Sequence, residues 1–232
     1  LGLLENLSKK GRLQSIMQGR HDTAIGRTIE HALGIPINSS PLPDYKGIEL
    51  KAARLNKISN RTNLFAQVPD WSISTLKSSK EIVDKYGYQR GEDLKLYCTI
   101  KTHSYNSQGL GFEVDFEQDQ LNELHITDGP VVSWLGDTLR TKLLEKHHET
   151  FWIKANSDIE NGDEFFTLKS ITHTKNPVSS QFLVLLEQGI ITMDHLIKRK
   201  DKTGKTSEKG PLFKIKPEHL SLIFPEPKHY NL

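Results

Sequence analysis

The stretch Pro43-Asp44-Tyr45-Lys46-Gly47-Ile48-Glu49-Leu50-Lys51 places an aspartate before a short apolar strand that carries a glutamate and a lysine two residues apart. Side chains alternate along a strand, so Glu49 and Lys51 share one face while the apolar residues beside them turn toward the core. Asp44 can reach the same face from the preceding turn. Two carboxylates suit a hard divalent cation such as Mg²⁺, and a lysine could position or activate a water. The pattern indicates metal-assisted phosphodiester hydrolysis, although an ordinary solvated strand gives this spacing by chance.

The composition is typical of a soluble globular protein, because 26% of the 232 residues are charged and the apolar content is moderate. We find no apolar run long enough to span a bilayer and no signal peptide, so we expect a cytoplasmic protein without a membrane partner. The single cysteine, Cys98, excludes an internal disulfide framework and a cysteine-rich zinc site, and we expect it to be an inert core thiol. The first residue is Leu1 and not methionine, so we expect either that a few residues are absent or that this is a fragment of a longer protein.

Two helices are predicted before the motif strand. The first has an apolar stripe of Leu13, Ile16 and Met17 and ends at Gly19. The second is capped near Asp22 or Thr23 and ends at Gly34, with Glu30 one turn after Gly26 on the same face.

After the motif strand, helical and strand patterns mix without a regular βαβ repeat, which predicts an α/β or α+β fold with a mixed sheet. We expect a strand over 63–68, and a capping box at 78–81 that opens a helix ending near Gly87. Alternating segments at 95–105 and 111–116 flank turn residues and predict a β-hairpin. Further helices are expected over 138–146 and 179–188, and further strands over 151–154, 165–172, 190–197 and 212–215.

Positive charge is concentrated in two segments although the net charge is only +2. Residues 198–216 hold eight lysines and arginines against two acids, and residues 46–61 hold five against Glu49 alone. Such a field can hold a polyanion, although a solvated loop explains the first segment equally well. Rival motifs fail: Gly204-Lys205-Thr206 lacks the first glycine of a P-loop, and the adjacent His147 and His148 would diverge on a helix.

Several segments together resemble the MutH/MvaI/BcnI group of the restriction-endonuclease-like (PD-D/E-x-K) superfamily. They are the helix Gly26-Arg27-Thr28-Ile29-Glu30, the strand Asp44…Glu49-Leu50-Lys51, the segment Asn63-Leu64-Phe65, and the segment Glu208-Lys209-Gly210-Pro211-Leu212-Phe213-Lys214-Ile215. The resemblance implies a nuclease core with a central mixed sheet flanked by helices, in two lobes around a DNA cleft. It places one nuclease domain over 1–232, with a catalytic lobe of about 1–116 plus parts of 137–175 and a recognition lobe of about 176–232.

The resemblance also implies roles for residues. Asp44 and Glu49 would ligate Mg²⁺, with Mn²⁺ or Ca²⁺ able to substitute in binding, Lys51 would orient or activate the attacking water, and Glu30 would be a further carboxylate of the site. Double-stranded DNA would be held by a set of basic residues: Arg54, Lys57, Arg61, Lys198, Arg199, Lys205, Lys209 and Lys214.

The favoured interpretation is a monomeric type II restriction endonuclease that cuts a short CCNGG-type site (CCWGG or CCSGG) by sequential nicking. A MutH-like mismatch-repair nickase and a DNA-binding module with a vestigial site are the alternatives, and an additional N-terminal DNA-binding domain would fit a longer chain. The remaining possibility is a superficial resemblance, with the basic loop binding RNA or an acidic protein.

Overall fold

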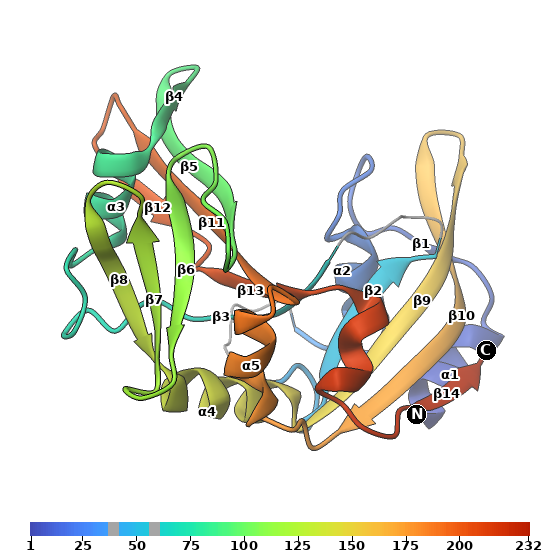
Figure 1. The fold of residues 1–232 in the computed structure, drawn as a ribbon. Helices are drawn as coiled ribbons and strands as arrows, with labels where there is room; N and C mark the ends of the chain where they lie inside the picture. The colour runs from blue at the N-terminus through green and yellow to red at the C-terminus, as the bar shows by residue number, and fades with distance from the viewer. Residues whose placement is uncertain (37–41, 56–60) are drawn as a thin grey trace. The chain divides into compact units, whose positions relative to one another are not determined.

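The structure, a computed structural model, describes residues 1–36, 42–55 and 61–232. The chain divides into two compact units (Figure 1). Unit 1 comprises Leu1–Asn60, Leu144–Pro177 and Phe224–Leu232, and unit 2 comprises Arg61–Leu143 and Val178–Ile223. Residues 61–116, which were expected in the catalytic lobe, belong to unit 2 together with Val178–Ile223.

Unit 1 is built on a mixed sheet with strand order β1-β10-β9-β2, and β14 also pairs with β10. The strands are β1 (Leu13–Gln14), β2 (Glu49–Arg54), β9 (Glu149–Glu160), β10 (Asp163–Lys175) and β14 (Lys228–Asn231). The motif strand β2 runs parallel to β9, whereas the other pairs are antiparallel. The helices are α1 (Gly2–Lys9) and α2 (Ala24–Ala32), and the end of α4 (Gly136–His147) also belongs to this unit.

Helix α2 is anchored to the sheet by Ile25 and Ile29, which are both 1% exposed and lie in one apolar cluster with Ile153 and Phe166. Burying each such side chain contributes about 1.5–3 kcal/mol. Ile48, Leu50 and Ala52 pack at the edge of the same cluster, as the predicted alternation requires. The opposite face of β2 is thereby left to Glu49 and Lys51.

The first predicted helix is wrong. Leu13 and Gln14 form strand β1 and pair with Phe166 and Phe165, while the first helix, α1, ends before them. Three apolar residues within five positions match a single helical turn, which is too short a pattern to specify a helix, and only Leu13 of the three lies in β1. The second predicted helix is confirmed as α2.

Unit 2 contains a sheet with strand order β3-β13-β11-β5-β4, to which β12 is added beside β11, and a sheet with order β6-β7-β8. The bounds of the first sheet are β3 (Thr62–Ala66), β4 (Tyr88–Arg90), β5 (Asp93–Ile100), β11 (Ile191–Lys200), β12 (Thr206–Glu208) and β13 (Leu212–Ile215). Those of the second are β6 (Leu110–Asp115), β7 (Gln120–His125) and β8 (Gly129–Leu135). The helices are α3 (Ser79–Tyr86), the first part of α4 up to Leu143, α5 (Gln181–Glu187) and the 3-10 helix η1 (Pro217–Leu222).

The capping box is confirmed, since the Ser78 side chain accepts a hydrogen bond from the N–H of Glu81 at the start of α3. The predicted hairpin is wrong: β5 pairs with β11, and β6 pairs with β7. The chain leaves β5 at Ile100 and bends through His103, whose φ is 57°, before it reaches the turn residues. This bend separates the two strands into different sheets.

The predicted fold class is confirmed, because helices and strands are mixed in both units and the sheet of unit 1 combines parallel and antiparallel pairs. No helix in the described part of the chain is long and apolar enough to cross a membrane.

Candidate active site

The motif strand brings Glu49 and Lys51 together on one face of β2. Lys51 Nζ lies 2.6 Å from Glu49 Oε1. The Glu49 side chain is only 2% exposed, whereas that of Lys51 is 23% exposed, so the lysine and not the carboxylate is open to solvent. A buried carboxylate with an ion-pair partner is unusual on an ordinary solvated strand, so the burial of Glu49 favours a functional site.

Asp44 is fixed beside the strand by a turn. Its Oδ2 accepts a hydrogen bond from the N–H of Leu50 at 2.8 Å, and Tyr45 and Ile48 bridge the turn through their backbones. Gly47 has a φ of 83°, a conformation that favours glycine, so the sequence Lys46-Gly47 permits the tight return of the chain. The turn explains how Asp44 reaches the strand although four residues lie between it and Glu49.

Glu30 extends from α2 into the same group of charges. Burial raises the pKa of Glu30, and the nearby carboxylates of Asp44 and Glu49 raise it further. Burial also raises the pKa of Glu49; Lys51 opposes this shift, and Asp44 adds to it. Three carboxylates thus repel one another, and a cation among them would relieve the repulsion. All four predicted catalytic residues therefore lie together in unit 1.

The donor set fits Mg²⁺ better than it fits a metal held in an all-protein cage. No group of three or more His, Cys, Asp and Glu side chains suited to holding a metal occurs among the residues that the structure describes. Mg²⁺ is usually bound by one or two carboxylates together with substrate phosphates and waters. Asp44 and Glu49 would supply that pair of carboxylates.

Lys146, at the end of α4, belongs to the site and was missed by the sequence interpretation. Its Nζ lies 2.8 Å from Glu49 Oε2 and donates a hydrogen bond to the carbonyl oxygen of Leu42 at 3.0 Å. Both oxygens of Glu49 therefore face a lysine. Nothing in the local pattern around Lys146 distinguishes it from other helical lysines, because the contact depends on the tertiary packing of α4.

Arg54 was predicted to hold a DNA phosphate, and the structure corrects this prediction. Its side chain is 3% exposed, and Nε and Nη2 bind the two carboxylate oxygens of Glu164 at 2.6 and 2.7 Å. Nη2 also donates to the carbonyl oxygen of His21 at 2.8 Å. The guanidinium is thus a buried structural group. Lys57, predicted for the same role, lies outside the described residues.

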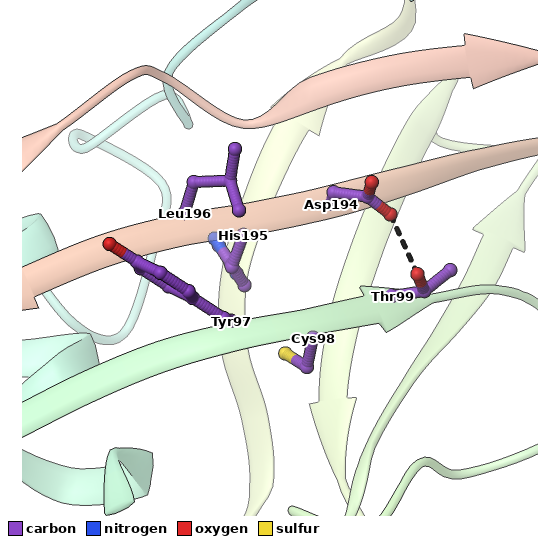
Figure 2. A pocket seen from close by; sticks show the side chains of 6 residues that line it. All are labelled: Tyr97, Cys98, Thr99, Asp194, His195 and Leu196. Atoms are coloured by element: carbon purple, nitrogen blue, oxygen red, sulfur yellow. Dashed lines mark hydrogen bonds between the residues drawn. The ribbon is translucent and has the colours of Figure 1, made fainter. Parts of the chain in front are cut away.

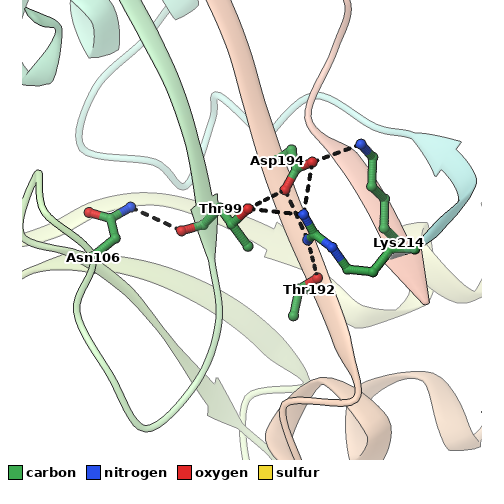
Figure 3. A network of polar contacts seen from close by, with 6 residues as sticks. Thr99, Asn106, Thr192, Asp194 and Lys214 are labelled. Atoms are coloured by element: carbon green, nitrogen blue, oxygen red, sulfur yellow. Dashed lines mark hydrogen bonds and ion pairs between the residues drawn. The ribbon is translucent and has the colours of Figure 1, made fainter. Parts of the chain in front are cut away.

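Two other residues predicted to bind DNA, Arg61 and Lys214, both pair with the carboxylate of Asp194 in unit 2. Figure 3 shows Lys214 reaching Asp194 from the neighbouring strand. Arg61 Nη1 lies 3.0 Å from Asp194 Oδ1, and Lys214 Nζ lies 2.7 Å from Asp194 Oδ2. Thr99 and Thr192 complete the network. Burial alone would raise the pKa of Asp194. Lys214, Thr99 and Arg61 outweigh this effect, so the pKa is lowered and the carboxylate stays ionised.

The basic segment around β11 and β12 is less positive than its sequence indicates. Lys198 lies 2.6 Å from Asp93, and Arg199 Nε lies 2.6 Å from Asp84. Asp93 lies in β5 and Asp84 lies in α3. A count of charges over residues 198–216 therefore does not include them. Lys205 and Lys209 are exposed, so they are the members of the predicted set that are best placed to meet a phosphate.

Cys98 lines a pocket of about 250 Å³ together with Tyr97, Thr99, Asp194, His195 and Leu196 (Figure 2). Burial raises the pKa of its thiol to about 12, and the charge of Glu123 adds to the shift. The thiolate is the reactive form, so we expect Cys98 to be alkylated far more slowly in the native protein than in denaturant at pH 8. Timed iodoacetamide labelling followed by mass spectrometry measures both rates, and equal rates would contradict the prediction.

Comparison with known proteins assigns the chain to a family. The family model described as the MvaI/BcnI restriction endonuclease family matches residues 1–224. The chain belongs to the MvaI/BcnI restriction endonuclease family. Membership makes it a site-specific DNA nuclease, as the resemblance of its segments to this group implied. No curated protein matches the chain.

Solved structures of MvaI share the fold of this MvaI/BcnI family member. The complex of restriction endonuclease MvaI with its cognate DNA substrate is 22% identical and has a TM-score of 0.83, covering 99% of this chain and 95% of that chain. Restriction endonuclease MvaI in the absence of DNA is 21% identical and has a TM-score of 0.57, covering 98% and 94%. These matches confirm the predicted restriction-endonuclease fold.

Proposed function

We propose that this family member is a Mg²⁺-dependent type II restriction endonuclease that cuts double-stranded DNA at a short CCNGG-type site (CCWGG or CCSGG). The observation that carries the metal dependence is the buried Glu49 beside Asp44, with Lys51 Nζ 2.6 Å from the Glu49 carboxylate. Family membership supports the class of target, and the enzyme is expected to act as a cytoplasmic monomer that nicks the strands in sequence.

Asp44 and Glu49 would hold the cation through their carboxylate oxygens. Bound Mg²⁺ would polarise the scissile phosphate and make an attacking water more acidic. Lys51 is partly exposed beside these carboxylates, so its ammonium can donate hydrogen bonds to a water or a phosphate oxygen and stabilise the charge that develops there. Glu30 would orient Lys51 or a water from the side of α2. Hydrolysis would leave a 5′ phosphate and a 3′ hydroxyl.

Digestion of phage DNA tests the proposal. We expect the purified protein to produce discrete fragments in Mg²⁺ and none in EDTA, and sequencing of the fragment ends should return one short motif. A time course on supercoiled plasmid should show open circles before linear DNA if nicking is sequential. Protein carrying Asp44→Asn, purified in parallel, controls for contaminating nucleases.

The other outcomes separate the alternatives. Open circles that never become linear would favour a nickase that depends on a partner, as in mismatch repair. Metal-independent DNA binding without cleavage in Mg²⁺ or Mn²⁺ would favour a vestigial site. Cleavage at ends that share no motif would contradict sequence specificity, and a motif outside the CCNGG class would correct the proposed target alone.

A further inference from the structure

Lys146 contacts both segments that carry the proposed metal ligands. Its ammonium group lies 2.8 Å from Glu49 Oε2 on β2 and donates to the carbonyl oxygen of Leu42, two residues before Asp44. The side chain is only 13% exposed, so water competes weakly for these contacts. Asp44 itself is held to the strand by the hydrogen bond that its Oδ2 accepts from the N–H of Leu50 at 2.8 Å. Lys146 therefore bridges the loop of one carboxylate and the side chain of the other.

The position of Lys146 is set by its neighbour in the helix. His147 is fully buried, its Nδ1 lies 2.9 Å from Thr150 Oγ1, and its ring stacks on Trp152 with a centroid separation of 5.5 Å. Thr150 is the register partner of Glu49 in the parallel pair of β9 with β2. The end of α4 is thus packed on β9, the strand that pairs with β2. This packing fixes the backbone position from which the Lys146 side chain extends.

We propose that Lys146 is a positioning residue that holds the Asp44 turn and Glu49 in register, so that their two carboxylates can meet one divalent cation. This inference rests on the proposed function, because it assumes that Asp44 and Glu49 are the metal ligands. Groups that orient metal ligands typically change metal affinity about 10–100-fold when they are removed. Lys146 also compensates the charge of buried Glu49 at Oε2, whereas Lys51 contacts Oε1.

Binding of Mn²⁺ to the DNA-free protein tests the inference without relying on cleavage. The electron paramagnetic resonance signal of free Mn²⁺ falls when the ion binds, which gives a Kd for each variant. We expect Lys146→Met, which keeps most of the apolar stem, to weaken Mn²⁺ binding about tenfold or more. Lys146→Arg should recover a large part of the affinity because it keeps a cationic donor. Thermal melting of each variant confirms that the protein is folded.

Lys175→Met is the matched control, because Lys175 pairs with Glu149 at 3.1 Å in the same unit but does not touch the proposed ligands. It should bind Mn²⁺ like the wild type. Asp44→Asn tests the proposed metal site itself. If it leaves Mn²⁺ binding intact, the proposed metal site is wrong.

If Asp44→Asn loses the metal while folded Lys146→Met binds as well as the wild type, only the positioning role is overturned. Tighter binding by Lys146→Met would also overturn it, because Lys146 would then act as a competing cation. Equal losses in Lys146→Met and Lys146→Arg would mean that the cationic donor is not what positions the site.

Discussion

Lys51→Ala should lower the rate of DNA cleavage about 10³-fold while DNA binding stays close to that of the wild type. The ammonium group is the partly exposed cation beside buried Glu49, at 2.6 Å, and its proposed partners are the attacking water and the phosphate. Interactions with charge that develops only in the transition state affect the rate more than the affinity. Affinity for DNA depends instead on many phosphate contacts, of which Lys51 would be one at most.

Single-turnover cleavage of an end-labelled duplex, with enzyme in excess, measures this rate without a contribution from product release. Binding is measured separately on the same duplex in Ca²⁺. Lys51→Arg keeps the charge but changes the geometry of the donors, and should fall between the wild type and Lys51→Ala. Cleavage by Lys51→Ala at the wild-type rate would remove Lys51 from the mechanism. Parallel losses of binding and cleavage would make it a DNA contact instead.

The clustering of the proposed catalytic residues could be predicted because their geometry follows from local rules. Glu49 and Lys51 share a face through the alternation of a strand, and the turn chemistry of Lys46-Gly47 brings Asp44 back to it. Glu30 follows the helical period of α2. The resemblance of these segments to a known family then gave the class of enzyme, which the match over residues 1–224 confirms.

The parts that could not be predicted depend on contacts between segments far apart in the chain. Lys146 enters the site because α4 docks on β9, and no periodicity within α4 encodes that contact. The basic segment near β11 is partly neutralised by Asp84 and Asp93, which a local count of charges does not include. The predicted hairpin of β5 with β6 failed for the same reason. Both segments are strands, as their alternation predicted, but β5 pairs with β11 and β6 pairs with β7.

Arg54→Met should destabilise the protein by about 3–5 kcal/mol, because it leaves the carboxylate of Glu164 buried without its cation. Each side chain of the pair is only 3% exposed, and two hydrogen bonds of 2.6 and 2.7 Å join them. Burial opposes ionisation, but Arg54 and Ser157 hold the pKa of Glu164 below its ordinary value. The pair therefore stabilises the fold above the ordinary carboxyl pKa, and the contribution is lost as the pH falls through the lowered pKa.

Urea denaturation followed by circular dichroism at pH 7 measures the loss, and Arg61→Met is a suitable comparison. Arg61 also pairs with an aspartate, but its side chain is 23% exposed, so its removal should cost clearly less. The double variant Arg54→Met/Glu164→Leu should recover most of the stability, because it removes the unpaired charge together with its former partner. If Arg54→Met instead kept the wild-type stability and bound DNA more weakly, Arg54 would be a phosphate contact after all. The stability of the two single variants and the double variant thus decides whether this arginine, which lies three residues after Lys51, supports the catalytic strand or touches the DNA.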